Sequence, residues 1–461
     1  MENLIDMEVI YDINPATGKN IAAIPASAHK DVQEAVQLAR KAQQEWRALP
    51  FSERARCLVA GGKNLEQQAE KIADLITREM GKVYTEALGE VKGWALSIPS
   101  KLEEAQQALE HILLQGEKSS TQIVREPLGV IGAITPWNFP VGMPVEIIVP
   151  ALAVGNTVVF KPSEHVPLVG AEVYNCFSKE LPPGVLTLLQ GRGDTGAQLV
   201  ESDIDMVAFV GSQRAGMDIM SKAGKSLKRL MLELGGKDPM IVFADADLNA
   251  AAEVAVKESL RNTGQICNSI ERIYVEKSVQ DKFEALVLEK ARAWKYGEGH
   301  GNDIKMGPLV NAEQRLKVDQ HVQDAIRSGA RLLLGGFIPE GEGYFYPATL
   351  LTQVRQDMPI AREETFGPVI CLISFSGKEE EAVFLANDSE YGLCASVFTA
   401  DMARAERIAN RIRCGQIGIN RYLGDANGTP WVGAGKSGIG FLGTVEGVRQ
   451  FTLPKSISKP K

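Results

Sequence analysis

The chain has 461 residues, of which 44% are apolar and 23% are charged, and its formal net charge is −8. This composition is typical of a soluble globular protein, and the length predicts two or three domains. The acidic balance, without a basic run, argues against nucleic acid as a partner. The longest apolar stretch, residues 143–159, is interrupted by proline, glycine and glutamate, so we expect no membrane span. The acidic N-terminus lacks an apolar signal segment, and the expected location is the cytoplasm.

The cysteines and histidines indicate neither a disulfide framework nor a structural metal. None of the six cysteines forms a Cys-x-x-Cys pair, and the five histidines lie at no spacing typical of zinc ligands, so we predict no metal site. An isolated cysteine is most often a small buried apolar residue, and Cys176, Cys371 and Cys394 lie in apolar runs that suit this interpretation. Cys267 differs because glycine and amide side chains flank it.

The first 115 residues indicate mainly helices. Apolar residues recur at helical spacing over 29–46, a second helix begins at Ser52, and a third covers 70–80. Further along, short apolar runs bounded by glycine and proline predict strands. These strands are 129–134, 157–160, 185–188 and 206–210, with helices at 144–152 and 166–177 between them. Such alternation is typical of a doubly wound parallel sheet.

A second series of strands and helices follows Glu233. The predicted strands are 240–243, 272–275, 370–375 and 396–399, and the helices include 248–259 and 280–293. Two α/β units in tandem would place a ligand cleft where the carboxyl ends of their strands meet. Residues 447–457 indicate one more extended strand, which has few local partners and would pair with another element or another subunit.

One thiol and one carboxylate stand out as candidate catalysts. Cys267 ends the segment Asn-Thr-Gly-Gln-Ile-Cys, and Glu233 lies in Leu-Glu-Leu-Gly-Gly-Lys, where it is a single acid in an apolar setting. A free thiol is mostly protonated at neutral pH, so covalent catalysis needs a base or a positive field nearby. Partial burial would raise the pKa of Glu233 towards the range of a general base.

Four other segments combine chemistry with turns, and each also has a purely structural interpretation. Trp137 and Asn138 lie between two prolines, where an amide could face an oxyanion or the loop could be a simple turn. Lys161 and Glu164 follow a strand, where they could hold ribose hydroxyls or begin a solvated helix.

The other two segments are loops that could contact a nucleotide. Gly211 and Ser212 turn a strand into a helix, where backbone N–H groups could face a phosphate. Glu364 and Phe366 precede a Gly-Pro turn, where they could contact a second ribose and a nicotinamide ring, or form a charged loop.

These motifs, in this order, resemble the aldehyde dehydrogenase superfamily. The resemblance extends from about Asn14 to Thr452, nearly the whole chain. It implies an α/β fold with two doubly wound Rossmann-like domains and a small β oligomerisation element. The NAD-binding domain would cover 1–118 and 135–234, the catalytic domain 235–445, and the oligomerisation strands 119–134 and 446–461. A homodimer or homotetramer is implied.

The resemblance also implies a role for each motif residue. Cys267 would attack the aldehyde to give a thiohemiacetal, and hydride transfer would leave a thioester. The Asn138 amide and the Cys267 N–H would hold the oxyanion, and Glu233 would activate the hydrolytic water. The residues that match cofactor-binding positions are Trp137, Lys161, Glu164, Gly211, Ser212, Glu364 and Phe366.

The carboxylate of Glu164 suggests NAD over NADP, with NADP possible, because it would repel a 2′-phosphate. Glu233 favours hydrolysis to a free acid over acyl transfer to coenzyme A. A family member that has become a non-catalytic binding protein is an alternative of another class, which the presence of Cys267 and Glu233 disfavours.

The C-terminal region departs from the common family pattern, because Pro430-Trp431-Val432-Gly433 replaces a Pro-Phe-Gly-Gly segment. In this region the chain is most similar to the lactaldehyde and glycolaldehyde branch. Glu146 lies where semialdehyde-oxidising relatives often have an arginine, and Asp425 could add a second negative group. A neutral hydroxyaldehyde is therefore favoured, with an aminoaldehyde or succinate semialdehyde as the alternatives. Alternatively, Glu146 faces away and pairs with a lysine or arginine. The candidate residues of the substrate tunnel are Phe139, Glu146, Asp425 and Trp431.

Overall fold

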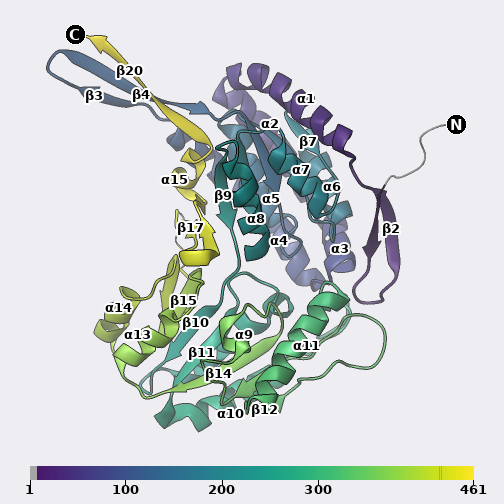
Figure 1. Ribbon diagram of the computed structural model, residues 1–461, viewed down its shortest axis with the longest axis vertical. Coiled ribbons are helices and arrows are strands. Elements are labelled where there is room, and N and C mark those ends of the chain that lie inside the picture. The colour runs from purple at the N-terminus through teal and green to yellow at the C-terminus, as the bar shows by residue number, and fades with distance from the viewer. Residues whose placement is uncertain (1–7, 425, 427) are drawn as a thin grey trace.

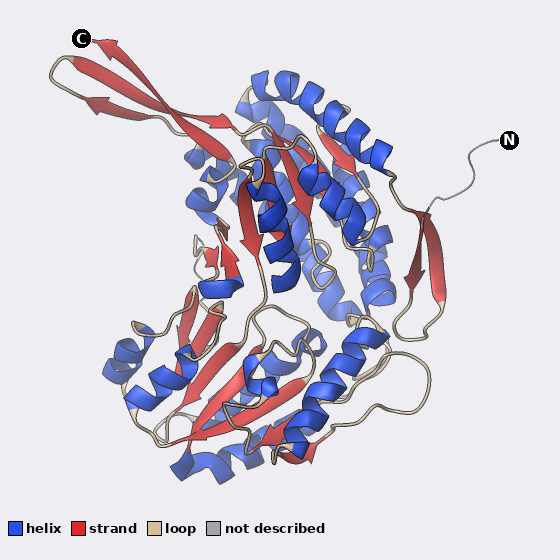
Figure 2. Ribbon diagram, viewed as in Figure 1, coloured by secondary structure: helices blue, strands red, loops and turns tan. Residues whose placement is uncertain are grey.

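Two open, mostly parallel sheets form the two lobes of the protein, and a narrow antiparallel sheet projects from them as an arm (Figures 1 and 2). The computed structural model describes residues 8–424, 426 and 428–461. The two doubly wound lobes and the small separate sheet confirm the predicted fold class.

The first lobe contains a six-stranded sheet with the order β18-β9-β8-β5-β6-β7. All of these strands are parallel except β18, which pairs antiparallel with β9. The strands are β5 (Val130–Ile134), β6 (Thr157–Lys161), β7 (Leu186–Leu188), β8 (Met206–Val210), β9 (Arg229–Glu233) and β18 (Gly438–Ile439). The middle strands are almost continuously apolar and buried, as expected where helices cover both faces of a parallel sheet.

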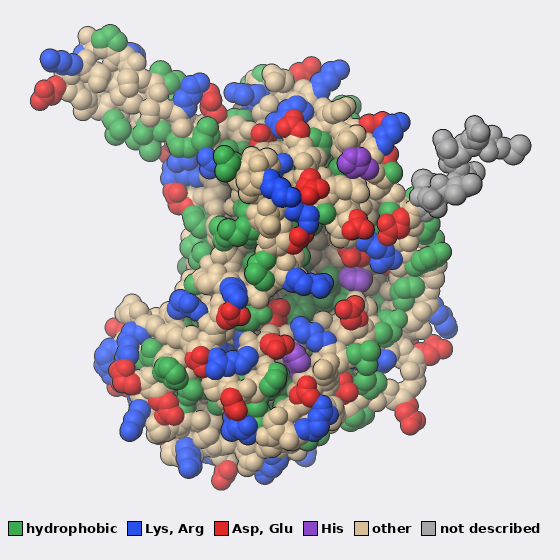
Figure 3. All heavy atoms as spheres, viewed as in Figure 1, with side chains coloured by type: hydrophobic (Ala, Val, Ile, Leu, Met, Phe, Trp, Pro, Cys, Tyr) green, Lys and Arg blue, Asp and Glu red, His purple; other side chains and the backbone are tan. Residues whose placement is uncertain are grey.

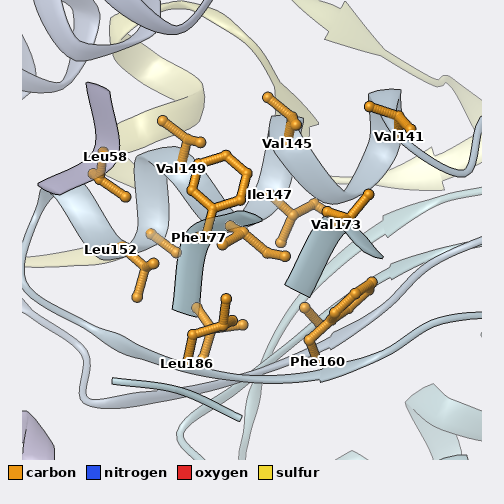
Figure 4. Packing of buried hydrophobic residues seen from close by; sticks show 14 of the residues in the cluster. Leu58, Val141, Val145, Ile147, Val149, Leu152, Phe160, Val173, Phe177 and Leu186 are labelled. Atoms are coloured by element: carbon orange, nitrogen blue, oxygen red, sulfur yellow. The ribbon is translucent and has the colours of Figure 1, made fainter. Parts of the chain in front are cut away.

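The eight described helices before β9 belong to this lobe and lie against the sheet or on each other. They are α1 (His29–Ala48), α2 (Phe51–Gln67), α3 (Ala69–Met80), α4 (Tyr84–Ala108), α5 (Gly142–Ala153), α6 (Pro167–Ser178), α7 (Gly193–Glu201) and α8 (Gln213–Gly224). α5 is apolar on nearly all sides because it contacts α2 and α4 as well as β5 and β6. Figure 4 shows aliphatic side chains of this helix, such as Val145, Ile147 and Leu152, near Phe160 and Phe177 in the core of this lobe.

The second lobe contains a seven-stranded sheet with the order β12-β13-β14-β11-β10-β15-β16, in which only β12 is antiparallel to its neighbour. The strands are β10 (Asp238–Val242), β11 (Ile270–Glu276), β12 (Arg331–Leu334), β13 (Thr349–Thr352), β14 (Val369–Phe375), β15 (Cys394–Phe398) and β16 (Gln416–Ile419). Its helices are α9 (Leu248–Leu260), α10 (Gln280–Arg292), α11 (Ala312–Arg327), α12 (Pro359–Arg362), α13 (Glu379–Asn387) and α14 (Met402–Ala409).

The arm consists of β3 (Ile112–Gln115), β4 (Ser119–Pro127) and β20 (Thr452–Pro460), with β4 in the middle. The expected boundaries of this element need three corrections. Residues 130–134 form β5 of the first lobe, because the chain turns at Leu128-Gly129, where Gly129 has φ +136°. Residues 112–115 belong to the arm and not to the first lobe, although they fall within the expected domain range 1–118. The strand expected from 447 begins only at Thr452, because Thr444–Arg449 is a helix, α15.

Three short pairings complete the fold. β1 (Val9–Ile13) and β2 (Asn20–Pro25) form an N-terminal hairpin that the sequence pattern does not predict. β17 (Trp431–Val432) pairs with β19 (Phe441–Leu442) beside the region between the lobes. The expected catalytic domain, 235–445, includes the segment from β17 to β19. However, the middle part of this segment, β18, joins the sheet of the first lobe.

Candidate active site

A cavity of about 780 Å³ lies between the two lobes, at the carboxyl ends of β5, β8 and β9 of the first sheet and at the amino ends of β10, β11 and β14 of the second. The expectation that carboxyl ends of both sheets meet at the cleft is therefore wrong for the second lobe. Figure 3 shows the surface hollowed in this region, between the upper and lower lobes. Every catalytic candidate lines this cavity, namely Asn138, Glu233 and Cys267. The loops after β5, β8 and β9 provide much of the wall, as expected for a ligand site at the edge of an α/β sheet.

The loop that carries Cys267 has an unusual backbone. Asn262, Thr263 and Gly264 are three consecutive residues with left-handed φ, at 49°, 58° and 70°. Side chains rarely adopt this conformation, so the surrounding structure must hold it in place. A Cβ at Gly264 would lie 2.1 Å from the carbonyl oxygen of Gly367, so only glycine fits there. The sharp turn after α9 presents Cys267 to the cavity.

Cys267 and Glu233 are in direct contact. The thiol donates a hydrogen bond to the Glu233 carboxylate, which lies at the end of β9. Gly236 permits this approach, since a Cβ there would lie 2.3 Å from the Cys267 carbonyl oxygen. Burial raises the pKa of Glu233 to about 7. Burial, and then the Glu233 charge, raises the pKa of the Cys267 thiol well above its usual value, so Cys267 holds its proton and Glu233 can accept one.

The segment 431–439 holds Glu233 by both its side chain and its backbone. The Trp431 indole N–H donates to Glu233 Oε1 at 3.1 Å. Gly438 pairs with Glu233 between β18 and β9, and the Leu234 N–H donates to the Ser437 carbonyl at 2.9 Å. The sequence indicated Trp431 only as a wall of the substrate tunnel. The structure places it on the cavity wall and also makes it a donor to the candidate base.

Asn138 is buried and held from two directions. Its Nδ2 donates to the Gln265 carbonyl at 3.0 Å, and its own carbonyl accepts from Lys82 Nζ at 2.8 Å. Lys82 is a buried partner of Glu90, whose Oε1 accepts the N–H groups of Val141 and Gly142 at 3.0 Å each. One amide N–H of Asn138 is thus used in fixing the side chain, and the other is available to a ligand in the cavity. Neither Lys82 nor Glu90 was foreseen from the sequence.

Five of the seven cofactor candidates line the same cavity, namely Trp137, Gly211, Ser212, Glu364 and Phe366. The Trp137 and Phe366 rings meet edge to face with centroids 5.6 Å apart. Gln314, another residue not foreseen, donates to the Phe366 carbonyl at 2.9 Å and supports its left-handed φ of 55°.

The carboxylate of Glu364 lies directly beside the glycine turn after Glu233. It accepts the Gly236 N–H at 3.0 Å, and a Cβ at Gly235 would clash with it. Burial, and then the charge of Glu271, raises the pKa of Glu364 to about 8. Protonation of Glu364 would give it an O–H donor for a ligand hydroxyl.

Lys161 and Glu164 lie next to the cavity wall and not on it. Lys161 ends β6, and its carbonyl accepts the Thr135 N–H at 3.1 Å, so it shares an edge of the sheet with the Trp137 loop. Its ammonium is buried, donates to the Pro162 carbonyl at 3.0 Å and lies 3.9 Å from Glu164. Burial lowers the pKa of Lys161.

These groups fit a nicotinamide dinucleotide. A buried ammonium with a single close acceptor has donors left for ribose hydroxyls. Ser212 caps α8 by accepting the Ala215 N–H at 3.3 Å, and the other N–H groups of that first turn could face a phosphate.

The comparison with known proteins identifies the family. The aldehyde dehydrogenase family model matches residues 5–457. Lactaldehyde dehydrogenase of Escherichia coli (strain K12) is 39% identical, over 95% of this chain and 92% of the relative. Betaine aldehyde dehydrogenase of Bacillus subtilis (strain 168) is 36% identical over 96% and 93%, respectively. A probable NADP(+) succinate-semialdehyde dehydrogenase of Sinorhizobium fredii is 36% identical over 95% and 90%.

The chain belongs to the aldehyde dehydrogenase family.

A solved structure of lactaldehyde dehydrogenase superimposes on the chain with a TM-score of 0.96 and 37% identity, covering 99% of this chain and 97% of the other. The resemblance to the family and to its lactaldehyde branch is therefore confirmed. The protein is an NAD(P)-dependent aldehyde dehydrogenase, an oxidoreductase that acts on aldehydes.

The part of the dehydrogenase cavity wall that α4 and α5 form contains a buried ion pair. Glu146 lines the cavity and forms a salt bridge with Lys101 of α4. Both sequence interpretations of Glu146 hold in part, since it faces the cavity and is paired with a lysine. Its negative charge is therefore compensated. Phe139 and Trp431 also line the cavity, whereas Asp425 lies outside the described residues.

Two features are absent from the described residues of the dehydrogenase, a metal-binding cluster and a helix that could span a membrane. Residues 8–424, 426 and 428–461 hold no group of three or more His, Cys, Asp or Glu side chains arranged for a metal ion. Within the same ranges, no helix combines the length and the hydropathy needed to cross a bilayer.

Proposed function

We propose that the enzyme oxidises a small hydroxyaldehyde to its carboxylic acid through a covalent intermediate on Cys267. The observation that carries this proposal is the meeting of Cys267, Glu233 and Asn138 in one cavity, with the thiol hydrogen-bonded to the carboxylate. Three separate loops bring these groups together, each with its own supporting contacts. A nucleophile, a base with a pKa of about 7 and an amide donor are what acyl chemistry at a carbonyl requires.

The first step is attack on the aldehyde. The Cys267 proton passes to Glu233, and the sulfur bonds to the carbonyl carbon to give a thiohemiacetal. The carbonyl oxygen becomes an oxyanion, which accepts hydrogen bonds from the free Asn138 N–H and from the Cys267 backbone N–H. Hydride then leaves the carbon, and the carbonyl reforms as a thioester. Bound nicotinamide supplies the acceptor for that hydride.

The second step is hydrolysis of the thioester. Glu233, after it has lost its proton to solvent, takes a proton from water. The resulting hydroxide attacks the thioester carbon, and the Cys267 thiolate leaves. A pKa of about 7 leaves about half of the Glu233 carboxyls ionised at neutral pH, so the base is available. The Trp431 hydrogen bond keeps its carboxylate oriented.

For the cofactor we propose NAD, with NADP as a possible second cofactor. Glu164 lies 3.9 Å from Lys161 at the expected position of the adenosine ribose, where its negative charge would repel a 2′-phosphate. Kinetics with both cofactors measure this preference directly.

The identity of the aldehyde rests on the cavity and not on the relatives. The three relatives are similarly related to this chain, at 36–39% identity, and their names specify a neutral, a cationic and an anionic aldehyde. On the wall formed by α4 and α5, the cavity offers the paired charges of Lys101 and Glu146. That pair suits a neutral, polar substrate such as a lactaldehyde-like or glycolaldehyde-like molecule. An aminoaldehyde or succinate semialdehyde is the second candidate, which a panel of aldehydes would reveal.

Two variants test the chemistry. Cys267→Ala is expected to abolish the steady formation of reduced cofactor, because no other thiol replaces the nucleophile. Glu233→Gln is expected to slow hydrolysis, with a steady rate lower by about a hundredfold or more. A burst of reduced cofactor close to one per active site should then precede the slow phase, read by rapid-mixing absorbance.

Matched controls guard against general loss of folding. Cys57→Ala in α2 and Glu103→Gln on the exposed side of α4 lie off the cavity wall and should keep the wild-type rate. Full turnover by Cys267→Ala would disprove the covalent mechanism. A wild-type steady rate in Glu233→Gln would remove Glu233 from hydrolysis.

A further inference from the structure

One face of α4 lines the cavity along most of its length. Gly89, Gly93, Ser97, Lys101 and Glu104 follow one another at helical spacing, and all of them are on the cavity wall. The two glycines have open space where a Cβ would be, so the helix leaves room at that end. Beyond them the face is polar, from Ser97 to Glu104, over about 10 Å of helix.

We propose that Ser97, Ser100, Lys101 and Glu104, together with Glu146, form a subsite that binds the hydroxyl groups of a polyhydroxylated aldehyde. This inference rests on the proposed function, since the aldehyde carbon of the same molecule would lie at Cys267. A two- or three-carbon substrate is shorter than the polar strip and would fill only part of it. The subsite therefore favours substrates with a longer, hydroxyl-rich tail.

The hydrogen-bonding capacity of the strip matches hydroxyl groups. Ser97 Oγ donates to the Trp94 carbonyl at 2.8 Å, and Ser100 Oγ donates to the Ser97 carbonyl at 2.7 Å. Both hydroxyl oxygens thus have their protons engaged and keep lone pairs to accept from a ligand. The Lys101 ammonium binds Glu146, lies 4.8 Å from the centre of the Trp94 ring and has further N–H donors. Acceptors and a donor lie along one wall, which suits hydroxyl groups because each hydroxyl can both donate and accept.

The charges of the subsite disfavour ionic tails of either sign. Lys101 faces a ligand ammonium with a like charge, while Glu104 and Glu146 face a ligand carboxylate with like charges. Burial raises the pKa of Glu104, and the nearby Lys101 ammonium opposes that effect. Because Lys101 compensates Glu146, which is only 7% exposed, neither is free to pair with an ionic ligand without losing its partner.

An apolar tail of the same length is disfavoured for a different reason. It would bury the Lys101 ammonium and the serine oxygens against carbon and remove water from them without replacing its hydrogen bonds. A hydroxylated tail restores those bonds. The difference between the two tails is the measurable signature of the subsite.

The experiment compares four aldehydes of four carbons on the full enzyme with NAD. These are butanal, erythrose, 4-aminobutanal and succinate semialdehyde, whose tails are apolar, hydroxylated, cationic and anionic. We expect the highest kcat/KM for erythrose, about tenfold above butanal. In the double variant Lys101→Met with Glu146→Leu, the ratio of erythrose to butanal should fall about tenfold, because the donors and acceptors are lost. Removing both charges together avoids leaving one of them buried and unpaired.

Lys92→Met is the matched control, since Lys92 is exposed on α4, lies off the cavity wall and should leave the ratio unchanged. The proposal is overturned if wild type prefers butanal, 4-aminobutanal or succinate semialdehyde, or if the double variant keeps the wild-type ratio. A wild-type enzyme that reduces NAD with none of the four, nor with lactaldehyde, would instead overturn the proposed function. The two failures are therefore distinct.

Discussion

At the scale of single residues, the base of the active site is tuned by the side chain of Trp431. A phenylalanine at this position would provide an aromatic wall without a hydrogen-bond donor. Tryptophan keeps an aromatic wall and adds one N–H donor, which binds Glu233 Oε1 at 3.1 Å. A hydrogen bond to the ionised carboxylate favours ionisation and partly offsets the effect of burial on the pKa of Glu233.

We predict that Trp431→Phe raises the pKa of Glu233 above its value of about 7, because burial then acts without that hydrogen bond. Since Glu233 acts as a base only when deprotonated, the acidic limb of the kcat–pH profile should move to higher pH, by about half a unit to one unit. The rate at pH 9 should be much less affected. Trp294→Phe, which is off the cavity wall, should leave the profile in place. An unchanged acidic limb in Trp431→Phe would show that the indole does not tune the base.

The same scale shows where sequence reasoning succeeds. Cys267, Glu233 and Asn138 could be found because each lies in a short, characteristic loop, and the structure does bring the three together. A lysine or arginine partner of Glu146 could be anticipated, but Lys101 could not be identified as that partner, because the two residues are 45 positions apart on two helices. The only local signal is the helical spacing of Ser97, Lys101 and Glu104 in a segment of mixed polar and apolar residues. That spacing predicts a solvated face as readily as a site.

At the scale of secondary structure elements, a pair of carboxyl groups attaches the N-terminal hairpin to the first lobe. Asp12 of β1 and Glu79 of α3 are both 1% exposed and share a hydrogen bond. Glu79 accepts the N–H groups of Leu168 and Val169, at 2.7 Å each, in the first turn of α6. In the described residues, no N–H or O–H group donates a hydrogen bond to either side-chain oxygen of Asp12. The hydrogen bond between Asp12 and Glu79 therefore needs a proton that the two carboxyl groups share.

The pH dependence of this contact follows from the pKa shift. Burial raises the pKa of Asp12 from 3.8 to about 6, although Glu79 as a hydrogen-bond partner and the nearby Arg78 oppose the shift. A carboxyl group whose pKa is higher in the folded state stabilises the fold at low pH. That contribution is lost as the pH rises from about 4 through about 6.

We therefore predict that Asp12→Asn stabilises the enzyme at pH 8 relative to wild type and gives little or no benefit at pH 5. An amide donates to the ionised Glu79 without needing a proton. The difference between the two proteins should change by on the order of 1 kcal/mol across this interval, so that plots of Tm against pH converge or cross towards acid. Asp303→Asn, on an exposed loop, is the control. Parallel Tm curves for wild type and Asp12→Asn would contradict the shared proton.

Element prediction worked best where burial is continuous. The apolar runs that form β5, β6 and β8 and the apolar helix α5 are buried on all sides, and their sequence leaves few alternatives. Strand β9 could not be predicted because it begins with an exposed arginine and ends in Glu233, just before the Gly235-Gly236 pair, so this segment resembles a turn. Helix α15 could not be predicted because its six residues are too few for a periodic pattern.

At the scale of the whole molecule, long-range order could not be predicted from local pattern. Two parallel sheets with a cleft between them follow from the alternation of strands and helices. However, the insertion of β18 beside β9 brings a segment near the C-terminus to the base of the active site, although the two are far apart in the sequence. Similarly, β20 crosses back to β4, and so the two predicted oligomerisation segments form one sheet. The sequence indicates strands there but does not specify their partners.

The arm has no core of its own. Every residue of β3 is exposed, and so is nearly all of β20, while no helix covers either face near its tip (Figure 1). The cross-strand register places Leu113 and Ile457 opposite Gln122 from either side, so the two share one face, and Leu453 lies further along that face. Their exposed fractions are 63%, 49% and 45%. A three-stranded sheet that exposes leucine and isoleucine is expected to be covered by a partner, and we propose a second copy of this chain.

The double variant Leu113→Glu with Ile457→Glu tests that proposal. Placing two carboxylates on the shared face should make association unfavourable while leaving the strand pairing of the arm intact, since both side chains already face solvent. We expect the wild type to be a dimer or tetramer by light scattering after size-exclusion chromatography, and the double variant to shift towards the monomer mass. Leu316→Glu, at an exposed leucine of α11, should keep the wild-type mass.

A monomeric wild type, or a double variant of unchanged mass, would show that the arm serves another purpose. Because the active site lies in one chain at the contact of its two lobes, a dissociated variant should keep measurable oxidation of aldehyde, which separates loss of assembly from loss of folding.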